Sequence, residues 1–230
     1  MMKRKTSIII CLIFLLVIVT AFTACQGNKT DFTSSDDDAS TSLLQEDVFT
    51  TEMKNNSEEE TEMSNTKVKV VMENGGEFTI ELYPEYAPKT VANFVKLVKE
   101  GFYDGLVFHR VVDNFMCQGG DPEGTGMGGS DETIYGEFRA NGWSQNTLSH
   151  KRGVISMARS QNPNSASSQF FICYSDYCTA LDGDYAAFGK VVEGMEVCDD
   201  FCKQERRYNS MGEKAAPVEP IRIKTMTIVD

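Results

Sequence analysis

The chain carries the stretch FHRVVDNFMCQGGD at residues 108–121 and the stretch SQFFI at residues 168–172. The first predicts two short strands, 107–112 and 115–118, and the second leads into a third predicted strand, 170–173. Together they place Arg110 and the amides of Gln118 and Gln169 among phenylalanine and methionine side chains. That mixture suits a substrate that is mostly apolar but passes through a polar, strained state.

The sequence on either side of these stretches predicts further short strands and two helices. Apolar and polar residues alternate on both sides of Asn74-Gly75-Gly76, which predicts a β-hairpin over 67–82. Apolar residues at helical spacing predict helices over 87–99 and 195–203. Further strands are expected at 153–157, 186–192 and 221–228. This pattern predicts a mainly β fold, a closed antiparallel barrel capped by the two helices, because closure leaves no exposed sheet edge.

The net charge of −12 is unevenly distributed along the chain. Residues 26–66 carry eleven acidic residues against Lys29 and Lys54, a net charge of −9, whereas residues 67–230 carry 23 acids and 17 bases, a net charge of −6. No clustered basic face is indicated, so a nucleic-acid partner is not expected. Residues 67–230 are long enough for one domain with a proper hydrophobic core.

The N-terminus has the features of an export signal. Lys3-Arg4-Lys5 precedes an apolar run over 8–19 and small residues ending at Ala24, which predicts a signal peptide over 1–24. Phe22-Thr23-Ala24-Cys25 resembles the lipobox of bacterial lipoproteins. The resemblance implies cleavage before Cys25, a lipid on its sulfur, and anchoring to the outer face of the bacterial cell membrane. The alternative is an uncleaved membrane helix over 7–24, which is just long enough to span a bilayer.

Cys25 and the residues up to 66 form a predicted tether. High charge, many Ser and Thr residues and few aromatic residues give this segment little surface to bury, so a disordered acidic linker over 25–66 is expected. The folded domain would then occupy residues 67–230.

The cysteine pattern indicates neither a disulfide framework nor a metal site. Five cysteines remain in the predicted domain without any CxxC pair, and His109 and His150 are the only histidines, so a zinc site is not expected. Free buried thiols fit this spacing better; the five are Cys117, Cys173, Cys178, Cys198 and Cys202.

Several blocks in order resemble the cyclophilins, the prolyl isomerases. They are FHRV at 108–111, QGGD at 118–121, GVISMA at 153–158, SQFFI at 168–172, LDG at 181–183 and FGKV at 188–191. The resemblance covers about 70% of the chain, from Lys67 onward. It implies a closed eight-stranded antiparallel barrel with two helices, isomerase activity without cofactor or metal, and proline-containing polypeptides as partners. We expect a monomer.

The reaction has a physical requirement that Arg110 can meet. Rotation about an X-Pro bond crosses a barrier of ~18–20 kcal/mol because amide resonance must be broken. In the twisted state the proline nitrogen regains a lone pair, and a donor aimed at it binds only the transition state. A guanidinium is always charged and carries a rigid set of N–H groups, so Arg110 is the predicted donor. Taken alone, an arginine on a strand is more often a solvated surface residue.

The resemblance also assigns the remaining site residues. Phe115, Met116, Phe171 and Leu181 match the family's proline pocket, whereas Phe170 should face the core because neighbours on a strand point to opposite sides. Gln118 and Gln169 match the amides that hold the peptide backbone and help position Arg110. The catalytic set is thus Arg110, Phe115 and Gln118, and the substrate-binding set is Met116, Ala158, Arg159 (through its main chain), Gln169, Phe171, Leu181 and Tyr185.

The sequence departs from the family at two groove positions. Ala180 stands where many members have an indole that donates to the inhibitor cyclosporin, and Tyr185 stands where many have a histidine. Ordinary isomerase activity with weakened cyclosporin sensitivity is therefore expected. Two other classes of function stay open, a module that grips proline-containing segments with catalysis incidental, and a purely structural lipoprotein.

Overall fold

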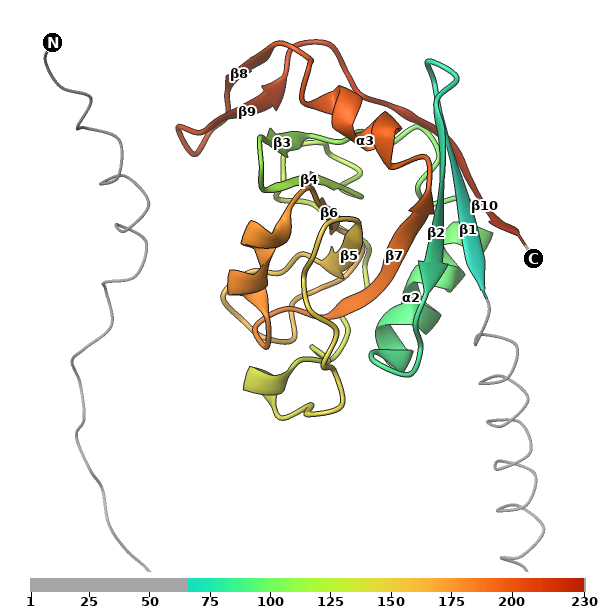
Figure 1. Cartoon of the computed structure of the whole chain (residues 1–230), viewed down its shortest axis with the longest axis vertical. Coiled ribbons are helices and arrows are strands. Elements are labelled where there is room, and N and C mark those ends of the chain that lie inside the picture. Colours follow the sequence, from blue (N-terminus) through green and yellow to red (C-terminus); the bar gives the residue numbers. More distant parts are fainter. Residues whose placement is uncertain (1–65, 230) are drawn as a thin grey trace, which may run out of the picture. The chain divides into compact units, whose positions relative to one another are not determined.

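A computed structural model describes residues 66–229, and its main element is one curled antiparallel sheet of eight strands (Figure 1). The order across the sheet is β10-β1-β2-β7-β5-β6-β4-β3. The strands are β1 (Lys67–Met72), β2 (Glu77–Leu82), β3 (Arg110–Val112), β4 (Met116–Gly119), β5 (Val154–Met157), β6 (Phe170–Cys173), β7 (Ala187–Glu193) and β10 (Ile223–Val229).

The expected closure of the barrel is wrong, although the strand number and the antiparallel pairing are confirmed. The edge strands β3 and β10 do not pair with each other. The segment ahead of β3 meets the start of β10 through backbone contacts. These are a bridge between Val107 and Arg222, a hydrogen bond of 2.9 Å from the Phe108 amide to the Ile221 carbonyl, and two hydrogen bonds of 2.9 Å that join Ile223 to Gly105 and Leu106. A second hairpin, β8 (Arg206–Tyr208) and β9 (Lys214–Pro217), lies beside β3. This hairpin protects an edge that closure would otherwise have removed.

The predicted first hairpin is confirmed, and its turn shows why glycine is required there. Gly75 has φ +86°, in the left-handed region that residues with a side chain rarely adopt. The Asn74 side chain accepts a hydrogen bond of 3.0 Å from the Gly76 amide. The turn fixes the register in which Val68 lies opposite Ile80, so that both side chains face the core.

Both predicted helices are present, α2 (Pro88–Lys99) and α3 (Met195–Phe201). Proline occupies the first turn of α2, where its missing N–H costs no intrahelical hydrogen bond. The buried side of α2 includes Val91 and Phe94, and the buried side of α3 includes Cys198 and Phe201. Between residues 66 and 229 there are also two short 3₁₀ helices, η2 (Arg139–Asn141) and η3 (Asp176–Leu181).

An aromatic cluster joins the helices to the sheet. The ring of Phe170 lies edge-on to Phe94 at 5.6 Å and to Phe108 at 5.8 Å between centroids. Its neighbour Phe171 belongs instead to a second, smaller cluster with Met116, Cys173 and Cys178. The predicted opposite orientation of the two phenylalanines is therefore confirmed, and the second cluster forms the base of the groove described below.

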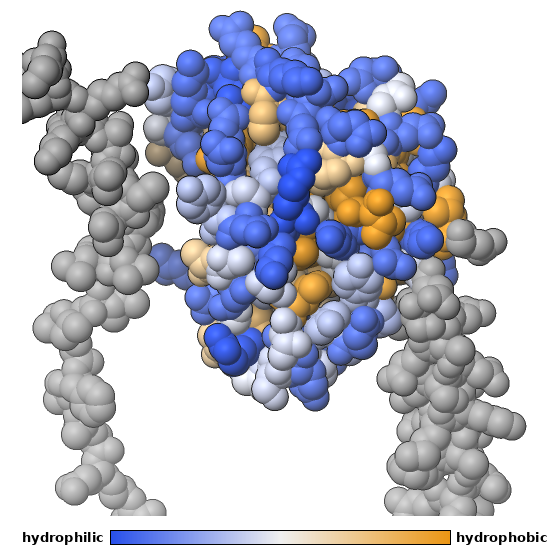
Figure 2. Space-filling model, viewed as in Figure 1, coloured by the Kyte–Doolittle hydropathy of each residue, from blue (hydrophilic) through white to orange (hydrophobic). Residues whose placement is uncertain are grey.

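Apolar side chains are gathered mainly inside the domain. On the face drawn in Figure 2, hydrophilic residues predominate and apolar residues form small groups between them. All five cysteines of the described part of the chain are free, as expected; Cys202 is half-buried and the other four are buried.

The predicted signal peptide, Cys25 and linker residues up to 65 lie outside the described residues. Between residues 66 and 229, no helix combines the length and the apolar composition that a membrane span requires.

Candidate active site

An open groove of about 260 Å³ runs along the face of the sheet that carries the smaller apolar cluster. Nine of the ten site residues expected from the sequence line it, and Gln169 is the one that does not. The lining residues are Arg110, Phe115, Met116, Gln118, Ala158, Arg159, Phe171, Leu181 and Tyr185.

Strand register brings the central residues of the groove together. Arg110 on β3 lies directly opposite Gln118 on β4, and Gln118 lies opposite Phe171 on β6. Residues paired across neighbouring strands project to the same face of the sheet, so these three side chains form a row. The tight turn between β3 and β4, with Asn114 at φ 60°, sets the pairing of the first two strands.

The floor of the groove is apolar and closely packed. The side chains of Met116 and Phe171 are buried, and Phe115, Leu181 and Tyr185 pack against them. The Tyr185 ring stands edge-on to Phe171, with 5.8 Å between ring centroids. Such a floor can accept a proline ring, which is apolar and has no N–H to satisfy.

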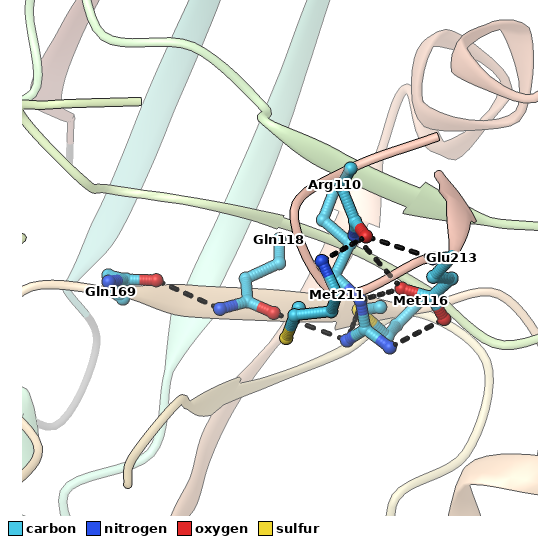
Figure 3. Close-up of polar contacts among 7 residues, drawn as sticks. Arg110, Met116, Gln118, Gln169, Met211 and Glu213 are labelled. Atoms are coloured by element: carbon cyan, nitrogen blue, oxygen red, sulfur yellow. Dashed lines mark hydrogen bonds and ion pairs between the residues drawn. The ribbon is translucent and has the colours of Figure 1, made fainter. Parts of the chain in front are cut away.

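Gln118, which is itself held by Gln169, contacts the groove side of the Arg110 guanidinium (Figure 3). Nη1 of Arg110 donates to Oε1 of Gln118 at 3.3 Å and lies 3.8 Å from the sulfur of Met116. Gln118 donates in turn to Oε1 of Gln169 at 2.8 Å, and Gln169 donates to the Gly128 carbonyl at 2.7 Å. Gln169 thus supports Gln118 from outside the groove, which leaves the Gln118 amide with a fixed orientation.

A residue that the sequence did not reveal holds the opposite edge of the same guanidinium. Nε of Arg110 lies 2.6 Å from Oε2 of Glu213, and Nη2 lies 2.9 Å from Oε1 (Figure 3). The hydrogen bonds from Arg110 lower the pKa of the Glu213 carboxyl below its ordinary value, so this group is ionised near neutral pH. The Asn209–Gly212 stretch resembles a turn, but no local pattern links it to a strand 103 residues away.

Arg159 contributes its side chain to the groove wall, not only the main chain that the sequence suggested. Its guanidinium lies 4.6 Å from the centroid of the Tyr185 ring and 5.0 Å from that of Phe138. Nε and Nη2 also donate to the Asp184 carbonyl at 3.0 and 2.9 Å. The side chain therefore fixes the segment that carries Tyr185.

The arrangement as a whole defines a class of site: an apolar groove on a sheet face, with one immobilised cation and one immobilised amide at its side. The sequence profile of the "Cyclophilin type peptidyl-prolyl cis-trans isomerase/CLD" family matches residues 67–228. The chain belongs to this family, and it is a peptidyl-prolyl cis-trans isomerase.

Curated relatives carry the same activity in their names. The peptidyl-prolyl cis-trans isomerase ppi1 of Schizosaccharomyces pombe is 44% identical over 151 residues, which are 64% of this chain and 90% of the relative. Peptidyl-prolyl cis-trans isomerase B of Bacillus subtilis is 47% identical over 126 residues, 55% of this chain and 83% of the relative.

A solved structure agrees with both the fold and the family. The cyclophilin-type isomerase of Cryptosporidium parvum, crystallised in the presence of the dipeptide Ala-Pro, superposes with a TM-score of 0.62 at 32% identity. The match covers 71% of this chain and 99% of that one.

Proposed function

We propose that this isomerase accelerates X-Pro rotation in exported or surface proteins during their folding, and that Arg110 stabilises the twisted proline nitrogen. One observation supports this role most directly. The Arg110 guanidinium is fixed beside the apolar floor, and its Nη1 lies on the side of the groove. The dipeptide present with the Cryptosporidium relative supports a proline-containing substrate for this chain as well.

The catalytic step needs only positioning and one hydrogen bond. The proline ring rests on the floor formed by Phe115, Met116 and Phe171, and the Gln118 amide holds the neighbouring peptide backbone. As the amide twists, its nitrogen becomes pyramidal and gains a lone pair, which accepts a hydrogen bond from the Arg110 guanidinium. The planar ground state has no such lone pair, so the interaction lowers the barrier without tightening substrate binding equally.

The role of Arg110 can be tested by measuring isomerisation of an Ala-Pro peptide with an NMR exchange assay. Arg110→Ala should lower kcat by roughly 10²–10³-fold, the usual effect of removing one preorganised donor. Arg207→Ala is a matched control, because Arg207 is exposed on β8 and is not among the groove-lining residues. Equal activity of Arg110→Ala and wild type would contradict the proposed role. Peptide binding without rate enhancement by wild type would favour the binding-module alternative.

The setting of the reaction is proposed from the N-terminal sequence. Cleavage before Cys25 and lipidation of its sulfur would hold the domain at the outer face of the membrane on an acidic tether. Mass spectrometry of the mature N-terminus should find a diacylglycerol-modified Cys25; an intact residue 1–24 segment would favour the uncleaved helix instead. Sedimentation of the mature protein should give the mass of a monomer.

A further inference from the structure

The β8–β9 hairpin brings a carboxylate to the edge of the guanidinium that faces away from the groove. Glu213 contacts Nε and Nη2 of Arg110, whereas Gln118 and Met116 contact Nη1. Glu213 is not among the residues that line the groove. The two acceptors therefore lie on different edges of one planar group, and together they fix both its position and its plane.

The hairpin that carries Glu213 is itself attached to the strand that carries Arg110. Arg206 in β8 makes two hydrogen bonds, 2.6 and 2.7 Å, to the Asp113 carboxylate in the turn after β3. Asn209 shapes the hairpin turn, since its side-chain oxygen accepts hydrogen bonds from the amides of Met211 and Glu213 at 3.0 and 2.9 Å. The position of the Glu213 carboxylate is thus built into the fold.

We propose that Glu213 is a positioning residue for the isomerase reaction, which holds the Arg110 guanidinium so that Nη1 is presented to the proline nitrogen. The inference rests on the proposed role of Arg110. Glu213 supplies the stronger of the two constraints, because a charged acceptor at 2.6 Å outweighs a neutral amide at 3.3 Å. Without it, a long side chain with several free torsions would keep only the contacts of Nη1 to Gln118 and to the Met116 sulfur.

The contact geometry argues against the opposite role, in which Glu213 would restrain the enzyme by occupying its cation. Such a contact would have to cover the nitrogen that faces the groove. Here the carboxylate engages the Nε–Nη2 edge, and Nη1 stays on the groove side with Gln118 and Met116. Binding of substrate at Nη1 therefore requires no rupture of the ion pair.

The test compares Glu213→Gln with wild type in the full chain. The substitution keeps the shape of the side chain and removes its charge, and it should lower kcat about 10- to 100-fold with KM little changed, as expected for a misplaced catalytic group. Glu213→Asp, which keeps the charge on a shorter side chain, should fall in between. Glu205→Gln is the matched control and should leave kcat unchanged, because Glu205 is an exposed acid at the base of the same hairpin.

Two further measurements separate positioning from a general structural effect. The Nε–H resonance of Arg110 in ¹⁵N NMR, assigned by its absence from Arg110→Lys, should be sharp in wild type and broadened in Glu213→Gln. In an Arg110→Ala background, Glu213→Gln should lower kcat no further, because Glu213 acts through Arg110.

Three outcomes would overturn the inference: an unchanged kcat in Glu213→Gln, an increased kcat, or a loss that persists undiminished in the Arg110→Ala background. These differ from a failure of the proposed function, in which Arg110→Ala itself would retain wild-type activity.

Discussion

The imidazole of His150 lies nearly parallel to the ring of Phe171, with 6.0 Å between the ring centroids and 14° between the planes. Nδ1 of His150 donates to Oδ1 of Asp182 at 2.8 Å, since a carboxylate can only accept. Nε2 lies 2.9 Å from the Ser156 hydroxyl, which donates to it in the neutral ring. The His150 side chain therefore supports the groove floor from beneath and is itself fully buried.

Acidification should weaken the fold through His150. Burial lowers the pKa of this imidazole below its ordinary value, and the hydrogen bond and charge of Asp182 only partly oppose that effect. Below about pH 6.5 the unfolded chain binds a proton at this position more readily than the folded chain does. The free energy of unfolding should therefore decrease as the pH is lowered below this value. Urea unfolding between pH 7.5 and pH 5 measures this dependence.

NMR titration identifies the group responsible. The His150 ring should take up its proton at a lower pH than a free histidine does, because burial lowers its pKa. The pKa of the other histidine of the chain, His109, is also lowered by burial, so the two resonances are followed separately in the same sample. A His150 that takes up its proton above pH 6.5, together with a stability that rises on acidification, would contradict this prediction.

Removal of the Arg159 side chain should impair substrate binding more than the chemical step. Its guanidinium covers one face of Tyr185 and donates to the Asp184 carbonyl, so Arg159→Ala frees the segment that forms this wall of the groove. We expect KM for the Ala-Pro peptide to rise by about two- to fivefold, the equivalent of roughly 0.5–1 kcal/mol for a cation–π contact at an exposed site. Kcat should change little. If kcat fell and KM did not, Arg159 would have a role in the transition state.

A buried carboxylate far along the chain caps helix α2. The N-terminus of α2 has no side-chain cap of its own, and Glu137 accepts hydrogen bonds from the Lys89 amide at 3.0 Å, the Thr90 amide at 2.8 Å and the Thr90 hydroxyl at 2.7 Å. A negative charge at this end also complements the helix dipole. Glu137 is fully buried, so its loss cannot be compensated by water.

Glu137→Gln should therefore lower the free energy of unfolding by about 2 kcal/mol, because one acceptor oxygen becomes a donor that faces other donors. Glu132→Gln is the matched control. Glu132 contacts the same helix through Lys96, but this ion pair is 3.3 Å long and largely exposed, and such pairs contribute little. Urea unfolding of the two variants should separate them clearly, and equal midpoints would show that Glu137 is not a cap.

Local sequence patterns predict most of the strands and both helices, but they contain no information about contacts between distant segments. Alternation around Asn74-Gly75-Gly76 identified the first hairpin, and the opposite orientation of Phe170 and Phe171 followed from strand geometry alone. Nine groove residues were found through family motifs, which record a spatial arrangement that periodicity does not contain. The prediction of a closed barrel was wrong because a sheet edge can also be covered by another segment. Here the β8–β9 hairpin lies beside the edge strand β3.

Polar contacts between residues far apart in the sequence could not be predicted. Glu137 and Glu213 are ordinary acids within polar segments, and each acquires its role from a partner 47 or 103 residues away. The β8–β9 hairpin was missed because its short strands, with buried Ala215 as the main inward residue of β9, lack a strong apolar alternation.

The groove rim beside Leu181 should determine inhibitor sensitivity. Ala180 is exposed at the end of η3, next to the groove-lining Leu181, and its methyl group offers neither a donor nor an aromatic face. We therefore expect the inhibition constant of cyclosporin for the wild-type enzyme to lie above the nanomolar range. Ala180→Trp should tighten inhibition by about tenfold, because one added hydrogen bond contributes roughly 1–1.5 kcal/mol. Ala180→Phe is the matched control, since it adds an aromatic ring without an N–H, and it should recover only part of that gain. Equal gains from the two variants would show that aromatic contact, not the indole donor, governs affinity at this position.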